Sequence, residues 1–251
     1  MIYVITHKKF KAVTMDGFYE ILLVGADMNK VAEYKVRDNT GENISLKNAY
    51  FCELTGIYWL WKNIKDNIVG ICHYRRYFAE SWFWGKRSIL TQERIQEYLS
   101  DSDIIMPRKR WFDGKNAKDF YAKHHNIDDW NKMVHIIHKL YPEYDNDVAW
   151  FEKQKSGYCY NMFITDGSNF NRYCEWLFSI LFELEKETFE KDYSIYNRRI
   201  YGFLSERMIN VWVHHNKLKV KEAFVYNPML FSMLADQTRR YIVRKIKGEK
   251  K

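Results

Sequence analysis

The segment IVGICHYRRYF, residues 68–78, decides the fold of this chain. Its first five residues contain no polar side chain, so the strand they predict must be covered on both faces. Strands of this kind lie in the middle of parallel sheets that carry helices on both sides. Polar and cationic residues follow at once as His73-Tyr74-Arg75-Arg76. The segment therefore predicts a central strand with positive charge at its carboxyl end.

Strands and helices alternate on either side of this segment. Apolar runs predict further strands at residues 2–6, 21–26, 103–107 and 158–165. Apolar residues at helical spacing predict helices at residues 46–62, 91–99, 127–140, 170–184 and 203–214. This alternation predicts an α/β fold with a mostly parallel central sheet flanked by helices. We expect one domain over residues 1–230 and a basic tail over residues 231–251.

The composition favours a packed cytoplasmic protein. Hydrophobic residues make up 47% of the 251 residues, aromatics 18%, and only three residues are proline. The start MIYVITHKKF is unlike a signal peptide, and no apolar run approaches the ~18 residues of a membrane span. The four cysteines show no CxxC spacing and lie in apolar segments, so we expect reduced core residues.

The net charge of +8 is concentrated in the tail. Seven of the 40 basic residues, but one of the 32 acidic residues, lie between Gln237 and Lys251. On a helix, Arg240 and Arg244 would face away from Ile242 and Ile246, which suits peripheral contact with an anionic membrane surface. A disordered charged terminus explains the same residues equally well. The concentration of charge argues against nucleic acid as a partner of the whole domain.

Three predicted strands run into basic residues. The strand at 2–6 is followed by His7-Lys8-Lys9, the strand at 68–72 by His73-Tyr74-Arg75-Arg76, and the strand at 103–107 by Arg108-Lys109-Arg110. In open α/β sheets, ligands bind outside the carboxyl ends of the strands. Convergence of the three clusters there would create a site for an anionic ligand such as a sugar nucleotide. The alternative is that these are solvated basic loops.

Five segments together resemble a bacterial family catalogued as a domain of unknown function. They are NISLKNAYFCELTGIYWLWKN (43–63), IVGICHYRRYF (68–78), YNMFIT (160–165), EWLFSILFELE (175–185) and GFLSER (202–207). Members of that family occur in capsular polysaccharide, exopolysaccharide and O-antigen loci and are regarded as glycosyltransferases, some similar to galactofuranosyltransferases. The resemblance covers residues 2–219. It implies a GT-A-like fold and transfer from a nucleotide sugar.

The turn after the central strand differs from most GT-A transferases, which carry Asp-x-Asp there to hold a divalent metal on the diphosphate. Here His73, Tyr74, Arg75 and Arg76 occupy that place. Because arginine binds phosphate oxygens bidentately, this cationic clamp could replace the metal at the leaving group. We therefore expect no metal ion and no cofactor besides the donor substrate, with Thr6 and His7 also at the donor.

The GFLSER segment supplies the candidate general base. On a helix, Leu204 and Met208 face one way, and Glu206 and Arg207 the other. An inverting transferase needs a base to deprotonate the acceptor hydroxyl, so we assign this role to Glu206 and place Arg207 on phosphate or sugar. A solvated helix face is the alternative reading of such a stripe.

Two further groups of residues are candidates for donor and acceptor binding. The donor candidates, which would hold the base or ribose, are Asp38, Asn39, Asn43 and Lys47. The acceptor candidates are Tyr121, His125, Asp128 and Asn161. Turn and capping chemistry explains the first group as well, and a surface loop with a helix cap explains the segment at 121–128. The spacing of its histidines and aspartates matches no strong metal signature.

These features predict a glycosyltransferase that moves a hexosyl group from a UDP-sugar, with UDP-galactofuranose as one candidate, to a saccharide of a cell-surface polysaccharide. Such acceptors are commonly lipid-linked, so a cytoplasmic enzyme at the inner face of the membrane fits the prediction. The alternative is a non-catalytic module that binds a nucleotide or a phosphorylated glycan. Turnover with an acceptor separates the two.

Overall fold

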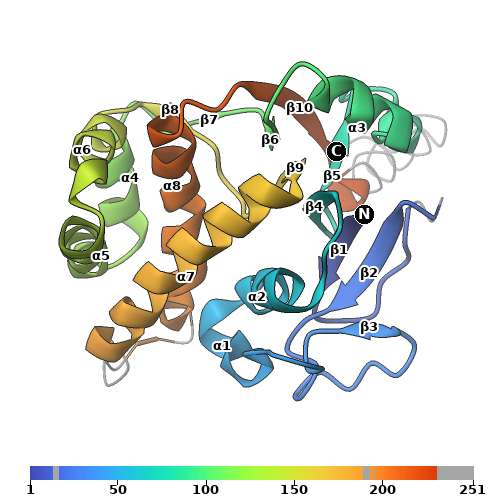
Figure 1. Cartoon of the computed structure of the whole chain (residues 1–251), viewed down its shortest axis with the longest axis horizontal. Coiled ribbons are helices and arrows are strands. Elements are labelled where there is room, and N and C mark those ends of the chain that lie inside the picture. The colour runs from blue at the N-terminus through green and yellow to red at the C-terminus, as the bar shows by residue number, and fades with distance from the viewer. Residues whose placement is uncertain (14–16, 189–192, 195, 231–251) are drawn as a thin grey trace, which may run out of the picture.

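The computed structural model describes residues 1–13, 17–188, 193–194 and 196–230. Within them, eight strands form one sheet in the order β3-β2-β1-β4-β9-β6-β10-β5 (Figure 1). The strands are β1 (Ile2–Thr6), β2 (Tyr19–Leu23), β3 (Val36–Arg37), β4 (Ile68–His73), β5 (Tyr77–Ala79), β6 (Ile104–Pro107), β9 (Phe163–Asp166) and β10 (Val220–Tyr226). The predicted basic tail at 231–251 lies outside the described residues.

Strand β4 occupies the central position that its sequence predicts. It pairs in parallel with β1 and antiparallel with β9. Val69 and Ile71 pack into the core on one face, and Cys72 into the core on the other. Gly70 is required here, because a Cβ at this position would lie 2.1 Å from the Ile2 side chain.

Parallel pairing joins β3, β2, β1 and β4, and also β6 and β10. Strand β9 runs against both β4 and β6, and β5 runs against β10. The chain thus has the α/β architecture and the largely parallel sheet that the sequence predicts. The antiparallel insertion of β9 separates the ends of β4 and β6 by an extra strand, which matters for the site.

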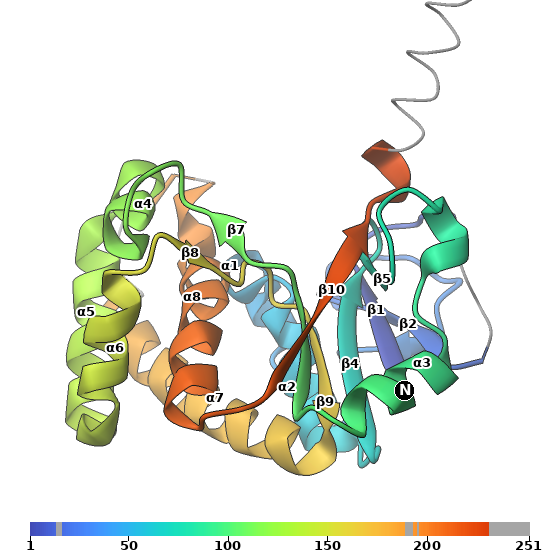
Figure 2. The same cartoon turned by 90° about the horizontal axis from the view of Figure 1, so that it is seen from above.

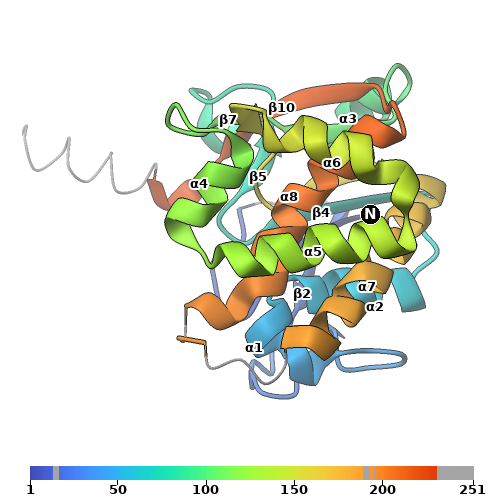
Figure 3. The same ribbon diagram turned by 90° about the vertical axis from the view of Figure 1, so that its left-hand side faces the viewer.

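Helices cover the two faces of the sheet unequally. α2 (Leu54–Asn63), α7 (Gly167–Thr188) and α8 (Ile200–His215) share the larger core with one face. α3 (Gln92–Leu99) packs on the other face, on the right in Figure 2. A further layer packs on α7 and α8, away from the sheet (Figures 1 and 3), and consists of α4 (Ala117–His124), α5 (Ile127–Leu140) and α6 (Asp145–Glu152).

Short elements complete the described structure. They are β7 (Arg110–Trp111) paired with β8 (Ser156–Gly157), α1 (Asn48–Phe51), η1 (Ser45–Lys47), η2 (Gly85–Ser88), η3 (Pro142–Tyr144) and η4 (Asn197–Arg199). Among the described residues, no helix combines the length and the apolar composition that crossing a bilayer requires.

Most predicted elements are confirmed, and three differ. The strand expected at 21–26 lies at Tyr19–Leu23, and the strand expected at 158–165 is reduced to Phe163–Asp166. The helix expected at 46–62 is interrupted: α1 ends at Phe51 and α2 begins at Leu54. The apolar spacing continues through the interruption, so periodicity alone could not reveal it.

The interruption has a local cause. Cys52 adopts φ 52° and ψ −128°, which no helix accommodates. Its carbonyl accepts a hydrogen bond of 2.7 Å from the Asn48 side chain, which also contacts the Thr55 hydroxyl at 3.0 Å. A side-chain amide thus takes the place of a helical backbone bond. As a result, Cys52 and Glu53 project from the helix start instead of lying along its side.

Candidate functional site

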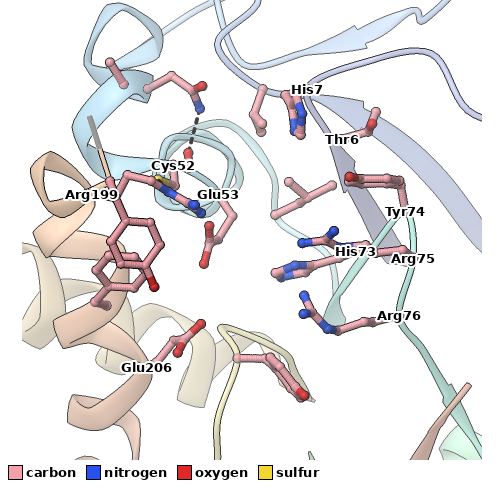
Figure 4. Close-up of a pocket in the computed structure, with 17 residues that line it drawn as sticks. Thr6, His7, Cys52, Glu53, His73, Tyr74, Arg75, Arg76, Arg199 and Glu206 are labelled. Carbon is pink, nitrogen blue, oxygen red and sulfur yellow. Dashed lines mark hydrogen bonds between the residues drawn. The ribbon is translucent and has the colours of Figure 1, made fainter. Parts of the chain in front are cut away.

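A pocket of about 690 Å³ lies beside the carboxyl ends of β1 and β4 (Figure 4). One wall comes from the sheet, with Thr6 and His7 at the end of β1 and the turn His73–Arg76 at the end of β4. The opposite wall comes from helical elements, with Glu53 at the start of α2 and Glu206 on α8. A volume of this size accommodates a ligand of nucleotide-sugar dimensions. The sheet wall carries Arg75 and Arg76, and the helical wall carries Glu53 and Glu206 together with Arg199.

The sheet wall is shaped by a tight turn. The backbone N–H of His73 donates to the Arg76 carbonyl at 3.1 Å, and the N–H of Arg76 donates to the His73 carbonyl at 2.8 Å. The N–H of Tyr74 donates to the Ile5 carbonyl at 3.1 Å, which joins the turn to β1. Arg75 therefore lies at the exposed tip of a rigid two-residue loop.

The two arginines of this turn are available to an anion. Among the described residues, no carboxylate lies within ion-pair distance of Arg75 or Arg76. The Arg76 guanidinium instead lies over the Tyr160 ring, 4.2 Å from its centroid. Stacking of this kind orients the guanidinium plane while leaving its edge N–H groups free to donate. This geometry suits phosphate oxygens.

Glu53 is held in place by a buried amide. Asn161 Nδ2 donates to Glu53 Oε1 at 2.6 Å and to the Gly202 carbonyl at 3.2 Å. The Ser205 hydroxyl donates to Asn161 Oδ1 at 2.9 Å. Because Gly202 and Ser205 belong to α8, Asn161 fixes Glu53 relative to the helix that carries Glu206.

Glu206 is partly buried beside a cation. Arg207 Nη1 donates to Glu206 Oε2 at 2.5 Å. The Arg207 side chain is 10% exposed and the Glu206 side chain is 21% exposed. Burial raises the pKa of Glu206, and the charge of Glu53 raises it further, while Arg207 and Arg76 oppose the rise. A carboxylate of raised pKa accepts a proton more readily than an ordinary one.

The histidines of the sheet wall are held neutral. Burial lowers the pKa of His73 below its ordinary value of 6.5, and Arg76 and Arg75 lower it further. Burial, with Lys8 and Arg75, also lowers the pKa of His7. The fixed charges lining the pocket are therefore those of three arginines, Arg75, Arg76 and Arg199, and two glutamates.

Backbone strain collects at this pocket. Cys52 has φ 52° and Tyr160 has φ 77°, and both line the opening. Positive φ at such residues costs about 1–3 kcal/mol and persists only where the surrounding structure imposes it, often at functional sites. Burial raises the pKa of the Cys52 thiol to about 11, so it stays protonated near neutral pH and is a poor nucleophile.

The structure brings many of the predicted site residues together. Those that line the pocket are Thr6, His7, His73, Tyr74, Arg75, Arg76 and Glu206. Arg207 and Asn161 lie behind the lining, each bonded to one of the two glutamates. Of the first predicted basic cluster only His7 lines this pocket, because Lys8 and Lys9 line a separate cleft, whereas the second cluster and Glu206 lie together here.

The four residues predicted to hold the base or ribose lie outside the pocket. Asp38 is fully buried and accepts hydrogen bonds from the Gly25 and Ala26 N–H groups at 2.8 and 3.0 Å and from the Ser45 hydroxyl at 2.7 Å. The others are likewise engaged: Asn39 with Asp27, Asn43 with Gly41 and Ser45, and Lys47 with Glu185. They hold the loops around the end of β2.

The segment predicted as an acceptor loop also lies outside the lining. Tyr121 is fully buried, near the Arg207 guanidinium, and Asp128 is in the first turn of α5. His125 stacks on Phe203, a pocket residue, with ring centroids 4.1 Å apart. Burial and Arg207 lower the pKa of His125 to about 4, so its ring is neutral there.

The third basic cluster does not reach the pocket. Arg108 lies over the Phe224 ring, Lys109 over Tyr158 and Arg110 over Phe120. Since β9 lies between β4 and β6, the end of β6 is two strand spacings, roughly 10 Å, from the end of β4. The expected convergence of all three clusters is therefore wrong for this one.

Several pocket residues were not predicted from the sequence, among them four with polar or reactive groups. These are Cys52, Glu53, Tyr160 and Arg199, whose Nε lies 3.0 Å from the Cys52 sulfur. Cys52 was expected in the core, whereas the other three cysteines are buried as predicted. An acid inside an otherwise apolar stretch was the available signal for Glu53. Nothing in the sequence pattern singles out Tyr160 or Arg199.

The described residues contain no cluster of three or more side chains suited to hold a metal ion. Two Asp-x-Asp triplets occur away from the pocket, at 101–103 and 145–147. Asp101 and Asp103 bind Lys219 through its side chain and its backbone N–H. Asp147 accepts from His214 and His215 at 2.5 and 2.8 Å. Both triplets therefore have structural partners.

The fold and the site together fit a GT-A-like glycosyltransferase architecture, with a cationic turn facing carboxylates across a pocket. Residues 1–217 match the family described as a domain of unknown function (DUF4422), and the chain belongs to that family. A solved structure described as the apo form of the bifunctional glycosyltransferase WbbM is similar over 89% of this chain, with 33% identity and a TM-score of 0.81. The match spans 44% of that chain. No curated protein matches.

Proposed function

We propose that this protein is a glycosyltransferase that moves a hexosyl group from a UDP-sugar to a saccharide acceptor in cell-surface polysaccharide biosynthesis. The observation that carries the proposal is the position of Arg75 and Arg76, which have no ion-pair partner among the described residues and face Glu53 and Glu206 across one pocket. The similarity to a bifunctional glycosyltransferase supports the same activity. UDP-galactofuranose is one donor candidate, and a lipid-linked saccharide is one acceptor candidate.

In this proposal, the turn after β4 binds the donor diphosphate. Arg75 and Arg76 would donate to its oxygens. As the glycosidic bond to the diphosphate breaks, negative charge grows on the leaving oxygen, and fixed guanidinium groups stabilise it there. The cationic turn occupies the place where a metal would serve, so we propose that no metal ion is needed.

Glu206 is proposed as the general base. Its raised pKa suits proton removal from the acceptor hydroxyl, and Arg207 keeps the carboxylate charged and oriented. Glu53, on the same wall, is proposed to orient the acceptor by accepting a hydrogen bond from another sugar hydroxyl. The Glu206→Gln variant should bind UDP normally and lose turnover.

Thermal unfolding with UDP, UDP-sugars and other nucleotides, each with and without EDTA, tests the proposal. A ligand that binds the native state raises the midpoint. We expect a rise with UDP that EDTA leaves unchanged, followed by UDP release in an acceptor-dependent assay. A rise that EDTA abolishes would show that a metal takes part. Binding without turnover with any acceptor would instead favour a nucleotide-binding module.

A further inference from the structure

Three aromatic side chains project from the connection between β5 and α3. Trp82, Phe83 and Trp84 are 64%, 57% and 64% exposed. We call residues 82–84 the aromatic loop. Adjacent large rings at this exposure leave a contiguous apolar patch in water, which in soluble proteins marks an interaction site. Neighbouring rings contact one another, with centroids 5.7 Å apart for Trp82 and Phe83 and 5.5 Å for Phe83 and Trp84.

The aromatic loop is closed at its base. The Ser88 hydroxyl, which is 6% exposed, lies 2.8 Å from the Ser81 carbonyl and 2.7 Å from the Gly85 carbonyl. The Glu80 N–H donates to the Ser88 carbonyl at 2.8 Å. Gly85 provides the positive φ of 59° at which the chain turns back. The exposed rings thus extend from an ordered turn that buries none of them.

Cations surround the aromatic loop. Lys86 and Arg87 follow it after one glycine, and Lys86 lines a cleft of about 530 Å³ with Lys8, Lys9 and Lys11. We call this the basic cleft. Lys9 pairs with Glu33, whereas among the described residues no carboxylate lies within ion-pair distance of the other four cations. The cleft floor is apolar, with Phe10 and Pro228 among its residues.

The basic cleft is next to the candidate active site. Tyr74 lines both the cleft and the active-site pocket. The end of β10 lies beside the β5–α3 connection, on the right in Figure 2. From Leu230, which is 53% exposed, the chain continues into residues 231–251, whose sequence is rich in lysine and arginine.

We propose that the aromatic loop and the basic cleft form a docking surface for an anionic lipid bilayer. Tryptophan and phenylalanine favour the boundary between headgroups and acyl chains, and lysine and arginine favour anionic headgroups. A surface that presents both kinds of side chain matches that boundary in polarity and in charge, even though one of its lysines, Lys9, pairs with Glu33. Docking there holds the active-site pocket close to the lipid surface.

Vesicle co-sedimentation of the full chain tests the surface. We expect binding to vesicles of equal parts phosphatidylcholine and phosphatidylglycerol, and much weaker binding to phosphatidylcholine alone. The double variant Trp82→Ala, Trp84→Ala should bind about tenfold more weakly, because the rings supply the buried apolar area. The matched control is Trp111→Ala, since Trp111 is 57% exposed on β7, away from the aromatic loop, and should leave binding unchanged.

A second pair of changes tests the charges. Lys86→Glu with Arg87→Glu should lower the preference for phosphatidylglycerol relative to the wild type, whose basic residues 231–251 are unchanged in the variant. Because all variants keep residues 231–251, differences between them report the docking surface itself. Wild-type binding by the tryptophan variant, or no vesicle binding by the wild type, would overturn the proposal. So would self-association in sedimentation velocity that disappears in the tryptophan variant, because the surface would then bind a second copy. Glu206→Gln should bind vesicles normally, so failure of the proposed enzyme function leaves this result unaffected.

Discussion

Replacing Arg75 by alanine tests the anion-binding turn most directly. Arg75 is exposed at the tip of the turn and has no ion-pair partner among the described residues, so its removal should change the free energy of unfolding by less than about 0.5 kcal/mol. A hydrogen bond to a charged group contributes about 1.5–3 kcal/mol. Loss of one such contact to diphosphate corresponds to UDP binding weaker by about tenfold to 150-fold.

The matched control is Arg108→Ala. Arg108 is also an exposed arginine after a strand of the same sheet, but its guanidinium lies 3.5 Å from the centroid of the Phe224 ring, outside the pocket. Both variants lower the net charge by the same amount. Long-range attraction of UDP should therefore weaken equally in the two, whereas only Arg75→Ala should lose a direct contact.

Isothermal titration with UDP at low and high salt measures both effects. We expect the difference between the two variants to persist at high salt, because direct contacts are screened less than distant charges. Equal UDP affinities for Arg75→Ala and Arg108→Ala would refute the assignment of the turn as the diphosphate site. The same result would remove the main argument for a metal-free leaving-group clamp.

Three other substitutions test the pocket and the framework around it. Glu53→Gln removes a negative charge that raises the pKa of Glu206. The acidic limb of the pH profile of kcat/KM, which reports the pKa of the base, should therefore move to lower pH. Gly70→Ala places a methyl group against Ile2 in the central strand, and urea unfolding should show destabilisation of about 1–3 kcal/mol. Asp38→Ala leaves three donors without their acceptor and should destabilise by about 3 kcal/mol, while the folded fraction still binds UDP in titration.

The central strand and its turn could be predicted because their signals are local. Every position of residues 68–72 is apolar or glycine, and cations follow directly. A strand buried on both faces must lie in the interior of a sheet. The carboxyl end of that strand then determines where His73 and the two arginines lie. The same local argument places His7, which follows β1, beside the turn, but Lys8 and Lys9 line a separate cleft.

Other parts of the site depend on contacts between distant segments. The sequence around residues 158–165 is as apolar as a parallel strand, yet β9 runs antiparallel between β4 and β6. That insertion removes Arg108 and its neighbours from the pocket. Likewise, the sequence at position 38 shows only that Asp38 is polar. Its burial against Gly25 and Ser45 results from the packing of the loops after β2.

Asn161 shows why the two walls of the pocket have to be considered together. From sequence it reads as an amide after an apolar run, suited to a sugar hydroxyl. In the structure, its side chain joins Glu53 to α8, and its backbone carbonyl lies 3.4 Å from His73 Nε2. One residue therefore touches the acidic wall with its amide and the basic wall with its carbonyl. The distance between the proposed leaving-group clamp and the proposed base sets the reaction geometry. Because Asn161 is buried and contacts both walls, that distance is fixed by the protein core and not by a surface loop.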